Sequence, residues 1–287
     1  MLAEYEQEGL NLAHPALRRL IGRLAYAEAS VAELTEQNQR LEDELQRDRR
    51  LKSMLHGDAM TEHLEQLVEN HEVVAGALID LNWFKLVNDG WGHEMGNELL
   101  RRLEQVLNAR FQRKGDLLLH IPLDEDSEPD DAVKPLDADA IARMGGDEFA
   151  VAITIDLNPS KKRTTERRAQ KLDKRVEKLH SHLRLAESAW LNDDEQGVRK
   201  LLRESPLLGE VELTDEQQEA VIAGLGFSIG IAAYDARPDE QEERIPGKVV
   251  VRELARQMDI RMYRDKRERR ERLRETHPAI RGLESTR

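Results

Sequence analysis

Two adjacent glycines followed by two adjacent acids form the stretch of this sequence with the clearest chemical potential. Gly145, Gly146, Asp147 and Glu148 lie between apolar runs at 140–142 and 149–155, which predict two buried strands. The spacing therefore predicts a hairpin with carboxylates at its tip. We expect the glycines to supply the positive φ angles of a tight turn and to leave the backbone open to a ligand. An ordinary hairpin turn with solvated acids is the alternative.

A third acid follows another predicted strand. Residues 73–79 form a continuous apolar run, typical of a strand buried on both faces, and Asp80 comes directly after it. If this strand lies beside the hairpin, at a spacing of about 4.8 Å, the carboxylates converge. Clustered carboxylates favour a hard ion such as Mg²⁺, which binds one or two protein carboxylates together with substrate phosphates. The pattern therefore indicates a site for phosphoryl or nucleotidyl transfer.

Predicted strands and helices alternate along the part of the chain that must position these acids. The strands are expected near 73–80, 140–144, 149–155 and 225–233, with a short one at 117–121. The helical patterns cover 64–68, 99–113, 161–189, 193–203, 214–223 and 249–275, with capping-box spacing at 214–217. This alternation predicts an α/β fold in which one sheet is flanked by helices. The acidic run at 124–131 lacks calcium-loop spacing, and we interpret it as a solvated surface loop.

A heptad pattern covers residues 17–45. With Leu17 at an a position, Asn38 is also at an a position, and every d position is Leu or Ala. Leucine at d with one asparagine at a favours a parallel two-stranded coiled coil. Such a helix would be about 45 Å long, at about 1.5 Å per residue. We therefore expect a homodimer through this segment, and the alternative is an amphipathic helix that folds back on its own domain.

The composition changes near residue 50, where we place a domain boundary. Residues 1–50 are expected to form the dimerisation segment, and 51–275 the main domain, with insertions near 115–139 and 160–206. Residues 276–287 are expected to be a C-terminal tail. A chain of 287 residues is long enough for one such domain with an accessory element.

Charge and apolar content exclude several kinds of partner. The net charge of −13 argues against a nucleic acid polymer or an anionic membrane surface, because phosphate contacts require a basic face. No apolar run approaches the roughly 18 residues of a membrane span, and no signal peptide is evident. The sequence contains no cysteine, which fits a reducing compartment. We therefore expect a cytoplasmic protein whose nucleotide, if it binds one, is small and accompanied by metal.

The motifs together resemble the GGDEF family of diguanylate cyclases, which condense two GTP molecules into cyclic di-GMP. The name motif is present at 145–149. The upstream pattern Asp-x-Asp-x-Phe-Lys-x-x-Asn-Asp-x-x-Gly-His-x-x-Gly-Asp is met at 80–97 with two departures, and residues 227–232 and 262–266 resemble the family's late strand and C-terminal helix. The resemblance covers residues 50–272 and implies a palm-like nucleotidyl cyclase domain. A GGDEF domain preceded by a coiled-coil helix is the predicted architecture.

The resemblance implies a metal and catalytic set around the acids. Asp80, Asp147 and the carbonyl of Leu81 would bind Mg²⁺, with Glu148 close to a second metal ion. Two ions per active site are implied, and Mn²⁺ is the alternative metal. Asp147 would also deprotonate the 3′-hydroxyl, with Glu148 in the catalytic set, and Lys85 would stabilise the transition state.

The resemblance also implies a substrate-binding set. Asn88 and Asn97 would read the edge of guanine, with His93 nearby, and Lys266 and Arg270 would bind the terminal phosphates. For the last two residues the alternative is a solvated basic helix face, because arginine and lysine are abundant in that helix. One GTP would bind to each subunit of a dimer, and the product would close across the two subunits.

The chain departs from the family pattern at several positions. Asn97 and Asn82 replace the aspartates of the upstream motif, and the opening motif is worn at 49–57. Asn97 keeps an acceptor oxygen but loses a charge-assisted bond to guanine. The product-inhibition motif Arg-x-x-Asp has Leu136 and Asp139. A diguanylate cyclase remains the favoured hypothesis, and the alternatives are a degenerate domain that binds GTP or a protein without catalysis, and a cyclase with relaxed base choice.

Overall fold

The computed structural model describes residues 23–26, 28–31, 51, 53–70, 73–113, 136–154, 165–192, 197–235 and 245–284. The chain divides into two compact units, Met1–Gln46 and Arg47–Arg287. In the first unit, residues 23–26 and 28–31 are helical. The remainder of the predicted coiled coil lies outside the described residues, as do the predicted strand at 117–121 and the acidic run at 124–131.

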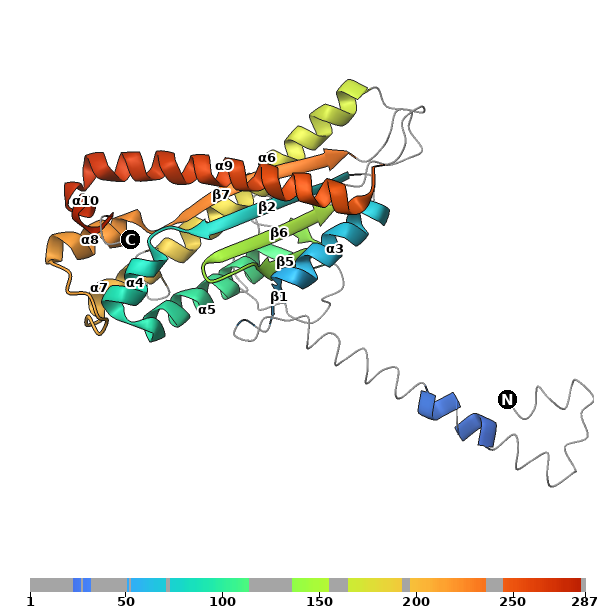
Figure 1. The fold of residues 1–287 in the computed structure, drawn as a ribbon, viewed down its shortest axis with the longest axis horizontal. Helices are drawn as coiled ribbons and strands as arrows, with labels where there is room; N and C mark the ends of the chain where they lie inside the picture. The colour runs from blue at the N-terminus through green and yellow to red at the C-terminus, as the bar shows by residue number, and fades with distance from the viewer. Residues whose placement is uncertain are drawn as a thin grey trace, which may run out of the picture. The chain divides into compact units, whose positions relative to one another are not determined.

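The second unit is built around a five-stranded sheet in the order β1-β5-β6-β2-β7 (Figure 1). Its strands are β1 (Leu55–His56), β2 (Val73–Leu81), β5 (Ala140–Arg143), β6 (Glu148–Thr154) and β7 (Phe227–Asp235). β2 lies between β6 and β7 and is antiparallel to both, whereas β1 pairs with β5 in parallel. A separate parallel pair joins β3 (Phe111–Arg113) and β4 (Leu136–Ala138).

Helices cover both faces of this sheet (Figure 1). The principal helices are α3 (Gly57–Asn70), α5 (His93–Arg110), α6 (Thr165–Leu191) and α9 (Gly247–Thr276). One buried cluster joins α5 and α6 to the sheet, and a second joins α3 and α9 to its other face. Short helices complete the unit: α4 (Phe84–Trp91), α7 (Val198–Glu204), α8 (Asp215–Gly224), η1 (Pro278–Ile280) and α10 (Arg281–Glu284).

The central strand β2 is buried on both faces, as its continuous apolar run predicts. Val73, Ala75 and Ile79 belong to the cluster on the α5 and α6 face, whereas Val74 belongs to the α3 and α9 face. This alternation follows from the two-residue period of a strand. The predicted fold class is therefore confirmed: one sheet with helices packed against it.

Helix α9 lies unusually close to β7. A Cβ atom on Gly230 would be 1.8 Å from the carbonyl oxygen of Met258 and 2.5 Å from the nitrogen of Met262. Only glycine allows this approach, because any side chain would overlap the helix backbone. Gly230 thus allows the short distance between the backbones of α9 and β7.

The hairpin of β5 and β6 forms as predicted, but its glycines act differently. Neither Gly145 nor Gly146 has a positive φ, so that expectation was wrong. Residues 144–147 connect the strands, and this longer connection does not require the left-handed residues of a two-residue turn. The guanidinium of Arg143 donates to the carbonyls of Gly145 and Gly146 at 3.2 and 2.7 Å. A Cβ atom on Gly146 would meet no other atom within 4 Å, so the tip is open.

The segment after α9 is part of the fold. The side chains of Ile280 and Leu283 are buried in the same cluster as α5 and α6. The expected tail at 276–287 therefore includes residues that complete the core. Among the described residues, no helix is long and apolar enough to span a membrane.

Candidate active site

The strand register brings the predicted carboxylates together. Asp80 at the end of β2 is paired with Glu148 at the start of β6. The main-chain nitrogen of Leu81 donates to the main-chain oxygen of Asp147 at 3.0 Å. The condition on which the carboxylates were expected to converge, that these strands are neighbours, is therefore met, although their residues are far apart in the sequence.

Asp80 is buried, with only 5% of its surface exposed. The ammonium of Lys266, on α9, lies 2.7 Å from both carboxylate oxygens. Only its contact with Oδ2 has hydrogen-bond geometry, so Oδ1 is buried without a hydrogen-bond partner. A buried carboxylate oxygen in this condition can accept a further positive ligand.

Glu148 experiences the charge of its neighbours. Burial raises the pKa of its carboxyl, and the negative charges of Asp80 and Asp147 raise it further, while Lys266 opposes the shift. A nearby anion disfavours ionisation because like charges repel. A cation bound among these acids would therefore reduce the repulsion between their carboxylates, which Lys266 offsets only in part.

These residues fit a metal ion that also uses non-protein ligands. Within the described ranges, no three Asp, Glu, His or Cys side chains form a metal cluster by themselves. Mg²⁺ commonly needs only one or two carboxylates, because phosphates and water complete its shell. Oδ1 of Asp80, which accepts no hydrogen bond, and the raised pKa of Glu148 both fit such an ion.

The predicted base-reading residues lie on two packed helices. Asn88 is on α4, and its Oδ1 would be 1.9 Å from a Cβ atom on Gly96 of α5. Gly96 therefore lets the amide of Asn88 lie directly against α5. Asn97, the next residue along α5, is half-buried. His93 is exposed in the first turn of α5. The structure thus brings Asn88 close to the residue that precedes Asn97.

The two predicted phosphate-binding residues of α9 lie one turn apart, at the end of β2. Lys266 contacts Asp80, and the guanidinium of Arg270 lies over the ring of Trp83, 5.7 Å from its centroid. Such a stack is a cation–π contact. Lys85, by contrast, is exposed in the first turn of α4.

Trp83 is a site residue that the sequence reasoning did not identify. It is buried and has a left-handed backbone, with φ of 63°, which is unusual for a bulky residue. A Cβ atom on Gly224, at the end of α8, would be 2.6 Å from its Nε1. Trp83 is thus held between α8 and Arg270. Its place inside the upstream motif was the only available signal.

Two of the departures from the family pattern occupy structural positions. Asn82 is buried, and its Oδ1 accepts a hydrogen bond of 2.6 Å from the hydroxyl of Ser228. Leu136 is a core residue of β4, and Asp139 accepts hydrogen bonds from the backbone and hydroxyl of Thr154. The pattern Arg-x-x-Asp is therefore replaced here by a core leucine and an acid that contacts its own hairpin.

A family model, described as diguanylate cyclase, GGDEF domain, matches residues 54–125. Within this range the chain is similar to GGDEF domains. It is 31% identical over 101 residues to diguanylate cyclase DosC of Escherichia coli K12, which is 35% of this chain and 16% of that protein. It is 28% identical over 123 residues to the bifunctional diguanylate cyclase/cyclic di-GMP phosphodiesterase MucR of Pseudomonas aeruginosa, which is 43% of this chain and 14% of that protein. The chain thus matches less than a fifth of each relative.

Solved GGDEF structures also resemble the chain. The coiled coil and GGDEF domain of DgcB from Caulobacter crescentus, in complex with c-di-GMP, aligns with a TM-score of 0.45 and 17% identity, over 87% of this chain and 95% of that one. Diguanylate cyclase SiaD, in complex with its activator SiaC from Pseudomonas aeruginosa, gives a TM-score of 0.45 and 16% identity, over 93% of this chain and 76% of that one. The GGDEF resemblance inferred from the sequence motifs is confirmed by the family model and the curated relatives.

Proposed function

We propose that this chain is a diguanylate cyclase, which condenses two GTP molecules into cyclic di-GMP and releases two pyrophosphates. The observation that carries the proposal is the β2–β6 register, which sets Asp80 opposite Glu148. The contact of Lys266 with Asp80 adds a cation suited to phosphate at the same point. Carboxylates for a metal and cations for phosphates are the two requirements of nucleotidyl transfer.

In the proposed reaction, the 3′-hydroxyl oxygen of one GTP forms a bond to the α-phosphorus of the other. The bond from that phosphorus to the pyrophosphate oxygen breaks, and the hydroxyl proton passes to Asp147. Two such steps, one from each GTP, close the ring. Lys266 and Arg270 bind the departing pyrophosphate, and Lys85 stabilises the charge that develops in the transition state.

A divalent ion belongs to this proposal, since GGDEF diguanylate cyclases generally use one. Asp80, Asp147, Glu148 and the carbonyl of Leu81 would hold Mg²⁺, and its chemistry there is to neutralise phosphate charge and to lower the pKa of the attacking hydroxyl. Burial of Asp80 keeps water from its carboxylate, which strengthens its attraction to a cation. The paired half-sites require a dimer, for which the heptads at 17–45 provide a sequence basis.

A second candidate is a cyclase with relaxed base choice. Asn97 stands where the family pattern has aspartate, and an amide carries both an acceptor and a donor. Adenine presents a ring acceptor and an exocyclic amine, so Asn97 could pair with adenine as well. Products that contain adenine would be the consequence.

Incubation of the purified full chain with Mg²⁺ and GTP, ATP or both, followed by mass spectrometry of the products, tests the proposal. We expect cyclic di-GMP from GTP, with Asp147→Ala as the inactive control. Mixed or adenine products would support the second candidate. A folded, dimeric chain that binds GTP but forms no cyclic product would contradict both and leave a non-catalytic GGDEF domain.

A further inference from the structure

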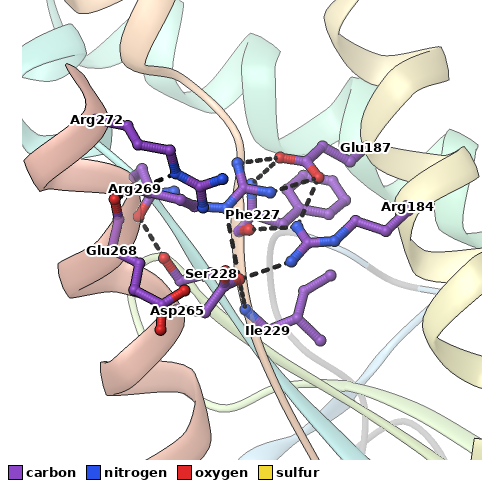
Figure 2. Close-up of polar contacts among 10 residues, drawn as sticks. Arg184, Glu187, Phe227, Ser228, Ile229, Asp265, Glu268, Arg269 and Arg272 are labelled. Carbon is purple, nitrogen blue, oxygen red and sulfur yellow. Dashed lines mark hydrogen bonds and ion pairs between the residues drawn. The ribbon is translucent and has the colours of Figure 1, made fainter. Parts of the chain in front are cut away.

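Four charged side chains from two helices surround the beginning of β7 (Figure 2). Arg184 and Glu187 come from α6, and Asp265 and Arg269 come from α9. Arg184 contacts Asp265 at 2.7 Å and Glu187 at 2.8 Å, and Arg269 contacts Glu187 at 2.8 Å. We call these four residues the α6–α9 network. The carboxylates are largely buried, with 9% of the side chain of Glu187 and 18% of that of Asp265 exposed.

The network binds the main chain of β7. The amide of Phe227 donates to Glu187 at 2.8 Å, and the amide of Ile229 donates to Asp265 at 2.9 Å. Arg184 in turn donates to the carbonyl of Phe227 at 2.9 Å. Because β7 is an edge strand of the described sheet, no other described strand pairs with these groups. The network therefore replaces a strand along this part of the sheet edge.

The same part of β7 is bonded on its other side to the candidate active site. Ser228 is paired with Asp80 in the β2–β7 ladder, and the amide of Asn82 donates to the carbonyl of Gly226 at 2.9 Å. A Cβ atom on Gly226 would be 2.4 Å from Oε1 of Glu187, so glycine is needed for the network to approach. Only the width of β7 separates the network from Asp80.

Two adjacent residues of α9 contact two adjacent strands. Asp265 accepts from the amide of Ile229 on β7, and Lys266 contacts Asp80 on β2. Apolar anchoring is absent here: α9 has buried residues up to Met262, and its next buried residue is Leu273. Polar contacts must therefore fix this part of α9 on the sheet. Those of Asp265 and Arg269 attach it to the strand edge and to α6.

The ionisation of Asp265 and Arg184 favours the attachment of α9 to β7 and α6. Burial acts to raise the pKa of Asp265, but hydrogen bonds from Arg184 and from the Ile229 amide outweigh it and lower that pKa. Burial likewise opposes the charge of Arg184, yet its bonds to Asp265 and Glu187 raise its pKa overall. Both groups are thus charged at neutral pH.

We propose that Asp265, supported by Arg184, is a positioning residue that sets the ammonium of Lys266 against Asp80. The expected effect of Asp265 on phosphate binding rests on the proposed cyclase function. The effect of Asp265 on the position of Lys266 does not rest on it. Helix α6 would thereby contribute to the active site without contacting the substrate. Loss of Asp265 should leave α9 helical but let the turn that carries Lys266 move away from the strand end.

Acylation of lysines in the full chain tests this placement directly. Brief treatment with acetic anhydride, followed by mass spectrometry, gives a rate for each lysine. Lys248 is exposed on the same helix and serves as the internal reference. In the unchanged protein we expect Lys266 to react more slowly than Lys248, because its side chain is only 22% exposed and its nitrogen is held against Asp80. The Asp80→Asn variant gives the acylation rate of Lys266 when the carboxylate of Asp80 is removed.

Asp265→Ala should raise the rate of Lys266 at least about threefold relative to Lys248, in the range of couplings between contacting residues. Arg184→Met should also raise the acylation rate of Lys266. Combining Arg184→Met with Asp265→Ala should raise that rate little beyond the effect of Asp265→Ala alone. Asp265→Asn keeps an acceptor for the Ile229 amide but loses the ion pairs, so it remains informative if alanine prevents folding. Glu253→Gln removes an exposed ion pair with Arg256 of the same helix and should change nothing.

An unchanged Lys266 rate in folded Asp265→Asn and Arg184→Met would overturn the proposal, as would equal acceleration of Lys248, which indicates general loosening. In the cyclase assay, Asp265→Asn should raise KM for GTP more than it lowers kcat. If the chain makes no product at all, the proposed function fails, while the acylation result still decides the role of Asp265.

Discussion

Asp80 and Glu148 face each other across the β2–β6 ladder, with Asp80 buried and Glu148 half-buried. Glu148 is consequently harder to ionise than an ordinary glutamate, because burial and the charges of Asp80 and Asp147 all raise its pKa. The negative charge of Asp80 therefore opposes the ionisation of Glu148. Carboxylates that repel one another are typical of cation-binding sites, because the bound cation reduces the repulsion.

The pH dependence of stability should reveal this repulsion. A carboxyl whose pKa is raised in the folded protein contributes stability below its unfolded pKa, and that contribution is lost as the pH rises through the folded pKa. Without divalent ions, Glu148→Gln should therefore unfold at a higher temperature than the unchanged protein at about pH 8, and the difference should vanish near pH 4. Thermal unfolding in EDTA measures it. Addition of Mg²⁺ should stabilise the unchanged protein more than the variant, and a pH-independent difference would contradict the assignment.

Asp147→Ala should abolish turnover and leave the fold intact. The main chain of Asp147, which alanine retains, makes the bond to Leu81. We expect product formation to fall by at least about 100-fold, as for loss of a general base. The free energy of unfolding should change by only about 0.5 kcal/mol, as for a surface substitution. Cyclase assays and thermal unfolding of the same preparation check both parts, and near-normal product formation would remove Asp147 from the site.

Much of the fold was predictable from local pattern. The apolar run at 73–79, the capping box at Thr214 and the helical pattern at 249–275 each carry a signal that does not depend on distant residues, and the described elements follow them. The convergence of Asp80 with Asp147 and Glu148 was also predictable, because acids at the ends of neighbouring strands must meet.

Other features depend on long-range contacts and could not be predicted. The α6–α9 network joins residues 81 positions apart, such as Arg184 and Asp265, and charged residues in a basic helix usually remain solvated. The left-handed Trp83 is stabilised by packing against Gly224 and Arg270 rather than by its own preference. Gly145 and Gly146 misled the turn prediction, because glycine permits a positive φ without requiring one.

The N-terminal segment should couple dimerisation to activity. The division of the chain after Gln46 gives a clean point for truncation, and Leu51 and Met54, which follow it, are buried in the second unit. Residues 47–287 should therefore fold as a monomer whose activity per subunit falls on dilution. Asn38→Ile should raise the stability of the full-length dimer and relax its choice of oligomer. Sedimentation and assays over a concentration series test this, and dilution-independent activity of the truncated chain would contradict the coupling.

The substitution at residue 97 should control the affinity for GTP. An aspartate there would accept from both the ring and exocyclic N–H groups of guanine, whereas the amide of Asn97 has one acceptor oxygen. Loss of one charged hydrogen bond costs on the order of 1.5 to 3 kcal/mol, or roughly ten- to a hundredfold in binding. The packing of Asn88 against Gly96, the neighbour of Asn97, supports a shared role for these two helices in binding the base.

We therefore predict that Asn97→Asp strengthens GTP binding by at least about tenfold and shifts the preference from ATP toward GTP. Asn82→Asp is the matched control, because it makes the same chemical change at a buried residue that contacts Ser228. Competition between GTP and ATP at constant Mg²⁺ concentration measures both effects. Asn82→Asp should leave the ratio of GTP to ATP affinity unchanged. If Asn97→Asp also leaves that ratio and the GTP affinity unchanged, residue 97 does not contact the base, and the base lies away from the packed surfaces of α4 and α5.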